Sequence, residues 1–153
     1  MIIQQQSLRH PEILAKRNAF FMKVRLKTVL TAKTLSQNGL TIVATPQSFI
    51  YGDKIKIILS LDTHSGDLSF DLTKVTTLID SSGTSYIPTV WTGTLPGGHH
   101  SQGTLTFPSL EGRPSSMELT IKNIYGADWR FEWNLQTKVH KPDTIEVNRG
   151  EIN

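Results

Sequence analysis

Two adjacent histidines, His99 and His100, are the residues of this 153-residue chain whose types and spacing most directly suggest chemistry. They follow Pro96-Gly97-Gly98, a tripeptide that can bend the backbone sharply. Imidazole rings bind Cu(II), Ni(II) or Zn(II), and a bent loop can direct both rings at one ion. A firm site needs a third or fourth ligand, for which the candidates are Asp62, His64, Asp67 and His140. The alternative is that one histidine bonds to the backbone while the other is solvated.

Other reactive groups give no support for catalysis. The chain has no cysteine, which excludes disulfides, thiol nucleophiles and cysteine-based zinc sites. No serine lies in a Gly-x-Ser-x-Gly sequence, and Gly97-Gly98 lacks the Gly-Lys-Ser/Thr ending of a phosphate-binding loop. Most acidic residues, such as Asp53 and Asp80, stand alone in turn sequences. We therefore predict that the protein is not an enzyme and that its one candidate cofactor is Cu or Zn.

Trp91 precedes the same glycine-rich turn and differs in its setting from the other two tryptophans. An aromatic ring at the mouth of a loop can stack on a sugar ring, a peptide or a partner protein. The alternative is that Trp91 caps the end of the fold. The candidate binding surface predicted from the sequence consists of Trp91, Gly97, Gly98, His99 and His100.

Strands are the elements that must position this loop, because hydrophobic residues recur with a two-residue period along most of the chain. In the stretch 129–135 the hydrophobic side chains share one face, which places Trp129 and Trp133 in the core. The run 75–79 and the run 84–90 read as a hairpin, and Pro88 predicts an edge strand or a bulge. The other strands are expected within 23–30, 40–44, 54–61, 68–73, 103–107 and 117–121.

The expected organisation is a single antiparallel β-sandwich of about 7–9 strands over residues 23–137, with a closed barrel as the alternative. A polar lead occupies residues 1–22 and includes a short helix expected over residues 11–22, where Pro11 and Glu12 suit a helix start. Residues 138–153 are polar and charged, which is typical of a tail.

Three features resemble immunoglobulin-like β-sandwich modules of bacterial and archaeal cell-surface proteins and lipoproteins. They are the Asp-x-x-Gly-x-x-Tyr hairpin at 80–86, the Gly-x-Leu-x-Phe strand at 103–107 and the alternating aromatic strand at 129–135. The resemblance extends over about residues 40–135. It implies a binding, spacing or assembly role and an extracellular or cell-surface location, although no export signal is visible at the start of the chain.

Charge is unevenly distributed, because residues 1–40 contain seven basic residues and one acidic residue. Such asymmetry suits contact with nucleic acid or anionic lipid, but a solvated face is the preferred interpretation because the charges are spread out. No apolar run approaches the length needed to span a bilayer. The sequence therefore predicts a non-catalytic binding or assembly module with a protein or cell-surface partner, and a histidine-based metal-binding protein as the alternative.

Overall fold

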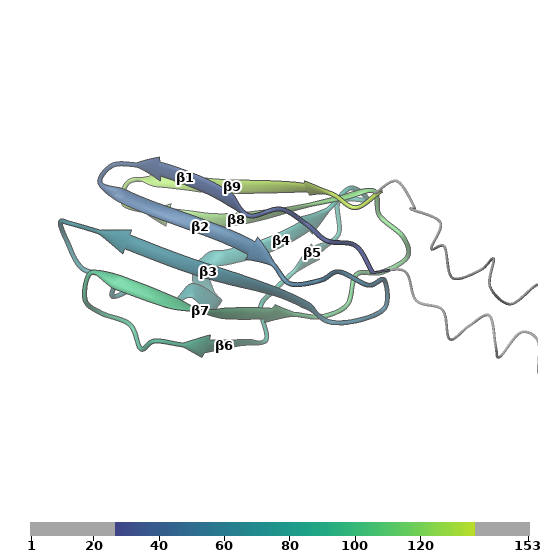
Figure 1. Cartoon of the computed structure of the whole chain (residues 1–153), viewed down its shortest axis with the longest axis horizontal. Helices are drawn as coiled ribbons and strands as arrows, with labels where there is room; N and C mark the ends of the chain where they lie inside the picture. Colours follow the sequence, from purple (N-terminus) through teal and green to yellow (C-terminus); the bar gives the residue numbers. More distant parts are fainter. Residues whose placement is uncertain (1–26, 137–153) are drawn as a thin grey trace, which may run out of the picture.

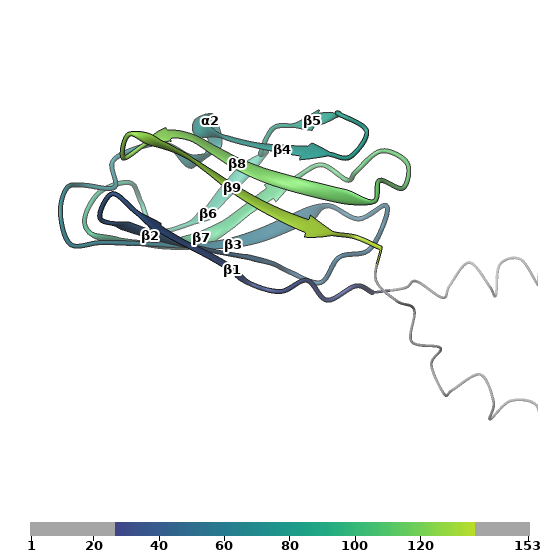
Figure 2. The same ribbon diagram turned by 90° about the horizontal axis from the view of Figure 1, so that it is seen from above.

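Two antiparallel β-sheets stacked face to face make up the part of the protein that the computed structural model describes, residues 27–136 (Figures 1 and 2). The predicted all-β class is therefore confirmed. The lead and helix predicted over residues 1–22, the tail 138–153 and His140 lie outside the described residues. So does most of the basic N-terminal segment.

The first sheet has five strands in the order β1-β2-β3-β7-β6, and the second has four in the order β5-β4-β8-β9. All neighbouring strands pair antiparallel. The first sheet consists of β1 (Lys33–Gln37), β2 (Leu40–Pro46), β3 (Ile55–Thr63), β6 (Val90–Gly93) and β7 (His100–Phe107). The second consists of β4 (Thr76–Asp80), β5 (Ser85–Tyr86), β8 (Ser116–Ile124) and β9 (Ala127–Asn134).

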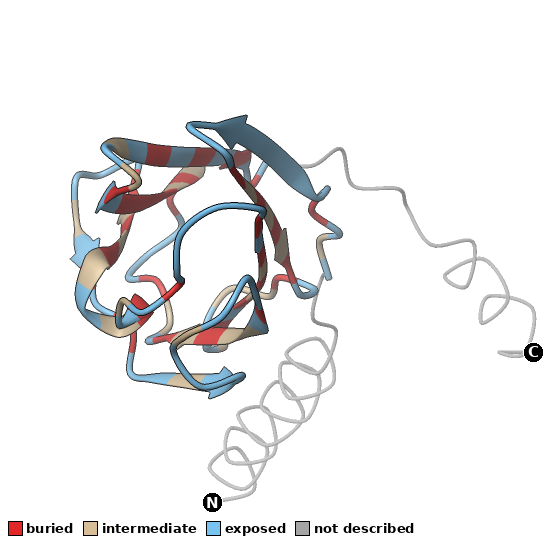
Figure 3. Cartoon of the chain, turned by 90° about the vertical axis from the view of Figure 1, so that its left-hand side faces the viewer, coloured by how far each residue is buried: buried red, intermediate tan, exposed pale blue. Residues whose placement is uncertain are grey.

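The core lies between the two sheets, where buried residues from both inner faces meet (Figure 3). Strand β9 alternates buried and exposed residues, as the two-residue period predicted. Trp129 is 0% exposed and Trp133 is 2% exposed, so their predicted core positions are confirmed. Each indole N–H is satisfied, since Trp129 donates to the Ile124 carbonyl and Trp133 to the Thr31 carbonyl. The ring surfaces are thus buried without leaving a polar group unpaired.

The predicted hairpin after β4 is present, because β4 pairs with β5. Its turn is organised by the buried carboxylate of Asp80, which accepts hydrogen bonds from the amides of Ser82 at 2.8 Å and Thr84 at 3.1 Å. The carboxylate also accepts the Tyr86 hydroxyl at 2.8 Å, and that hydroxyl accepts the Glu111 amide at 2.9 Å. The first and last residues of the Asp-x-x-Gly-x-x-Tyr sequence therefore close the turn, with the Asp80 carboxylate as the acceptor and the Tyr86 hydroxyl as a donor.

Alkaline pH is expected to destabilise the fold through Tyr86. Burial raises the pKa of its hydroxyl, and the bond to Asp80 acts in the same direction. Because the folded state holds this proton more tightly than the unfolded chain, stability is fully present below about pH 10 and falls as the pH rises further. Urea unfolding of the wild type and Tyr86→Phe across this range tests the point. The variant should lose less stability between about pH 9 and pH 11 than the wild type. Equal losses would contradict the prediction.

The strand predicted over residues 68–73 is wrong. Leu72–Val75 forms the short helix α2, in which Leu72 is buried. Asp71 caps the helix, since its carboxylate accepts from the Thr73 amide at 2.9 Å and the Thr73 hydroxyl at 2.6 Å. These bonds, the hydroxyl first, lower the pKa of Asp71. The local cap outweighs the two-residue alternation of apolar residues.

The strand predicted over residues 84–90 is divided. Ser85–Tyr86 belongs to the second sheet, whereas Val90–Gly93 belongs to the first. Pro88 lies in the crossing between the sheets and cannot donate a ladder hydrogen bond. Both β5 and β6 are edge strands, which agrees with the edge position that Pro88 predicted.

The strand predicted over residues 23–30 is reduced, in its described part, to an isolated bridge between Thr28 and Phe49. An unpredicted strand, β1, follows it and is exposed at all five residues. An edge strand that buries no face has no hydrophobic alternation to reveal it. Its pairing with β2 instead follows from the two-residue turn at Asn38-Gly39.

The chain enters and leaves the two-sheet domain at the same end, as Figure 1 shows and as the bond from Trp133 to the Thr31 carbonyl supports. Strand β1 produces this arrangement, because it carries the chain to the opposite end before β2 returns. In residues 27–136, no helix is long and apolar enough to cross a membrane.

Candidate functional site

The loops at the end of the domain opposite to where the described chain enters and leaves form one surface, which we call the loop end (left in Figure 1). It comprises residues 38–39, 64–71, 94–99 and 125–126. The Thr63 hydroxyl lies 2.9 Å from the Gly39 carbonyl, and the Tyr125 hydroxyl donates to the Ser65 carbonyl at 3.0 Å. Loops from both sheets are therefore tied to one another.

The predicted binding loop, Trp91 to His100, is held at Gly97 and Gly98 by the segment that follows β3. Leu68 donates to the Gly98 carbonyl at 2.9 Å, and Gly97 donates to the Leu68 carbonyl at 2.8 Å. The Gly98 amide also donates to the carboxylate of Asp67. Positive φ angles of 121° at Gly97 and 77° at Gly98 produce this path, which side-chain-bearing residues rarely adopt. The two glycines serve to shape the loop.

The base of the loop is closed by Thr94. Its amide donates to the Gln102 carbonyl at 3.0 Å, while its hydroxyl accepts the Gln102 amide at 3.0 Å. The same hydroxyl lies 3.0 Å from the hydroxyl of buried Ser101. The loop therefore begins and ends on a fixed hydrogen-bonded frame.

Trp91 is half-buried and packs against the core from strand β6. Its indole N–H donates to the Thr94 carbonyl at 2.9 Å. The ring lies against Gly103, where an added Cβ would come within 2.6 Å of Trp91 Cζ2. These contacts favour the interpretation that Trp91 caps the fold and supports the loop base.

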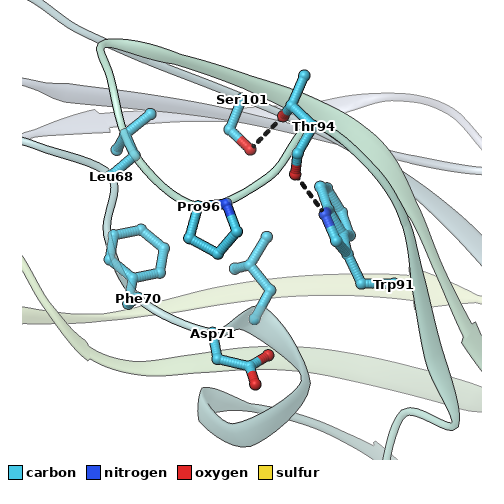
Figure 4. Close-up of a pocket in the computed structure, with 8 residues that line it drawn as sticks. Leu68, Phe70, Asp71, Trp91, Thr94, Pro96 and Ser101 are labelled. Atoms are coloured by element: carbon cyan, nitrogen blue, oxygen red, sulfur yellow. Dashed lines mark hydrogen bonds between the residues drawn. The ribbon is translucent and has the colours of Figure 1, made fainter.

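A small hollow lies beneath the loop, between Trp91, Phe70 and Pro96 (Figure 4). Its volume is about 20 Å³. That is room for about one water molecule, whereas small-molecule sites usually measure about 300–1,000 Å³. The hollow does not offer a binding cavity for a sugar ring or a nucleotide in this conformation.

His99 belongs to the loop end, and His100 is the first residue of β7 directly after it. His100 Nδ1 lies 2.5 Å from Asp62 Oδ1 across the β3–β7 pair, and the His100 side chain is 75% exposed. The His99 carbonyl accepts the Thr63 amide at 2.9 Å, which continues the same pairing by one residue. His99 itself lies in a bend directly before β7, outside the strand that holds His100. Within residues 27–136, no group of three or more His, Asp or Glu side chains is placed to hold a metal ion.

Leu95 is the feature of this surface that the sequence analysis missed. Its side chain is 85% exposed, the largest exposure among the large hydrophobic residues described. It precedes Pro96 at the tip of the tethered loop. A leucine directly before a Pro-Gly-Gly turn, with no apolar neighbours to pack against, is a signal that could have indicated an exposed hydrophobic residue.

Replacing Asp67 by alanine is expected to loosen the loop locally. The Gly98 amide would lose its acceptor and exchange with solvent faster, while the cost in overall stability would be about 1 kcal/mol or less. Amide hydrogen exchange measures this directly. Asp62→Ala is the matched control, because it removes the contact to His100 and leaves the Gly98 amide bonded. Unchanged exchange of Gly98 in Asp67→Ala would contradict the tethering role.

Comparison with protein-family models, curated proteins and solved structures found no match to this chain. Its function must therefore be argued from the geometry of the loop end.

Proposed function

We propose that this protein is a non-catalytic binding or assembly module that contacts a protein partner through its loop end. The observation that carries the proposal is the 85% exposure of Leu95 at the tip of a loop whose backbone is tethered on both sides. Exposing a large apolar side chain is unfavourable, and a fixed conformation reduces the entropy lost on binding. An exposed apolar side chain on a restrained backbone can therefore bury its surface against a partner with little further ordering.

The domain is proposed to be immunoglobulin-like. Without β1, the sheets β2-β3-β7-β6 and β5-β4-β8-β9 follow the A-B-E-D and C′-C-F-G strand orders of that architecture. By this analogy the β3–β4 and β8–β9 connections at the loop end correspond to the B–C and F–G loops, which lie at the antigen-binding end of variable domains. The analogy concerns architecture and adds only a general expectation of binding.

The position of the chain ends also supports this surface. The described chain enters and leaves the domain at the opposite end, so neither of these two points lies at the loop end. The cell-surface location implied by the resemblance remains part of the proposal. Nucleic-acid binding by the basic N-terminal segment stays the less favoured alternative to a solvated face, and most of that segment lies outside the described residues.

Site-specific photo-crosslinking tests the proposed contact. A photoreactive residue is placed at Leu95 or, as the control, at Ile87, which is 69% exposed and lies outside the loop end. The labelled protein is incubated with an extract of the cells that naturally produce it. We expect position 95 to capture a protein that position 87 does not. Excess unlabelled wild type should suppress that capture, and excess unlabelled Leu95→Asp should not. Equal capture at both positions, or equal competition by both proteins, would contradict the proposal.

A second candidate function is metal binding by His99 and His100. The observation in its favour is the contact between His100 Nδ1 and Asp62. Because an ionised carboxylate only accepts hydrogen bonds, this contact places the proton on Nδ1 and leaves Nε2 as a ligand, as in many carboxylate–histidine–metal arrangements. The lack of a third ligand within residues 27–136 makes this the weaker candidate.

Calorimetric titration with Cu(II) or Zn(II) tests whether the protein binds a metal ion. If the protein acts through a protein contact as proposed, we expect no stoichiometric binding of either ion by the wild type. Tight binding that disappears when both histidines are replaced by alanine would establish the second candidate instead.

A further inference from the structure

The turn between β1 and β2 contains the sole Asn-Gly pair in the sequence, Asn38-Gly39. Both residues have positive φ angles, 52° at Asn38 and 79° at Gly39, as a two-residue type I′ turn requires. Asparagine followed by glycine is the pair most prone to deamidation, because glycine leaves the following backbone nitrogen unhindered. The exposed turn therefore combines a reactive sequence with access to water.

The side chain of Asn38 also makes a structural contact. Its Nδ2 donates to the Tyr125 carbonyl at 2.8 Å, which joins the β1–β2 turn to the β8–β9 turn. The adjacent Gln37 makes a longer bond of the same kind, 3.4 Å, to the Asp128 carbonyl. Two amide donors thus clip a hairpin of the first sheet to a hairpin of the second at the loop end (Figure 1).

We propose that Asn38 is a self-modification site whose deamidation irreversibly opens this clip. The Gly39 nitrogen attacks Cγ of Asn38 and loses its proton to solvent, while the Cγ–Nδ2 bond breaks and ammonia leaves. Water then opens the resulting cyclic imide at either carbonyl, which yields aspartate or isoaspartate at position 38. A carboxylate cannot donate to the Tyr125 carbonyl and is repelled by it, so the clip does not re-form.

The clip also restrains the reaction that destroys it. While Nδ2 is bonded to the Tyr125 carbonyl, the Asn38 side chain is kept from rotating into the position in which the Gly39 nitrogen attacks Cγ. Reaction therefore requires the clip to open first. A hydrogen bond of ordinary strength corresponds to about a fivefold excess of the closed state, so the folded protein should react about fivefold or more slowly than the unfolded chain.

Peptide mass spectrometry during incubation at mildly alkaline pH tests the chemistry, with folded and urea-unfolded protein compared. Asn123 is an internal control, because it is also exposed with a positive φ of 55° but is followed by the branched residue Ile124. We expect conversion at Asn38 in both samples, faster in urea, with Asn123 unchanged. Equal rates in the two samples, or no preference for Asn38 over Asn123, would overturn the proposal.

Asn38→Asp tests the consequence, with Asn38→Gly as the variant that lacks the donor, carries no charge and accepts the positive φ of 52°. Amide exchange in β1 and in residues 125–128 should be faster in both variants than in wild type, and fastest in Asn38→Asp. Exchange in Asn38→Asp equal to that of wild type would show that Asn38 does not hold the clip and would overturn the proposal. This inference is independent of the partner proposed for Leu95.

Discussion

Gly103→Ala is expected to lower the free energy of unfolding by about 1–3 kcal/mol through overpacking at the base of the loop. The new Cβ would lie 2.6 Å from Trp91 Cζ2 and 2.7 Å from both Gly93 Cα and the Thr92 carbonyl oxygen. Two of these three atoms belong to the backbone of β6, so a change of side-chain rotamer cannot relieve the contact. Strand β6 would have to move away from β7, and Trp91 with it.

Urea unfolding of Gly103→Ala measures this effect. Thr104→Ala is the matched control on the same strand, because Thr104 alternates with Gly103 and points to the outer face. Amide exchange in β6 should rise in Gly103→Ala and stay unchanged in Thr104→Ala. Equal free energies of unfolding for the two variants would show that the close packing of Trp91 on Gly103 does not contribute to stability.

Asp80→Ala is expected to destabilise the protein by about 3 kcal/mol, because it removes a buried charged acceptor from three donors. The amides of Ser82 and Thr84 and the hydroxyl of Tyr86 would all lose their partner. Denaturant unfolding measures the loss, and Ser82→Ala, an exposed change in the same turn, serves as the control.

A double-mutant cycle with Tyr86→Phe isolates the contact between Asp80 and the Tyr86 hydroxyl. The two changes share one hydrogen bond, so their combined effect should be smaller than the sum of the single effects. Strict additivity would contradict the assignment of Asp80 and Tyr86 to one structural unit.

The parts of the fold that could be predicted from the sequence are those in which local pattern and burial agree. Strand β9 is one example, since its alternating aromatic residues bury one face. The β4–β5 hairpin is another, because Asp80 and Tyr86 bond within a single turn. In both cases the stabilising contacts involve residues close in sequence or on one strand.

Other elements were not predicted because the interactions that stabilise them leave no hydrophobic periodicity in the sequence. Strand β1 buries none of its residues, and α2 begins with a capping bond from Asp71 that competes with the alternation of nearby apolar residues. The split at Pro88 depends on which sheet each half joins, which is a property of the whole fold.

The glycine-rich loop could be predicted from the sequence, but the contacts that hold it could not. The loop containing His99 and His100 does lie at an exposed end, yet its restraints come from Asp67 and Asp62, which are 31 and 38 residues away from their partners. Sequence spacing does not reveal such contacts. Leu95 carries no reactive group, and its exposure depends on how the fold holds the loop.

The account depends most on Leu95 as the anchor of a protein contact. The most direct test measures the dissociation constant of the crosslinked partner for wild type, Leu95→Asp and Ile87→Asp. Both variants introduce the same charge at an exposed hydrophobic residue, so effects on folding should be small and similar. We predict binding weakened about tenfold or more by Leu95→Asp and left unchanged by Ile87→Asp. Equal affinity of wild type and Leu95→Asp would contradict the central claim that the loop end is the binding surface.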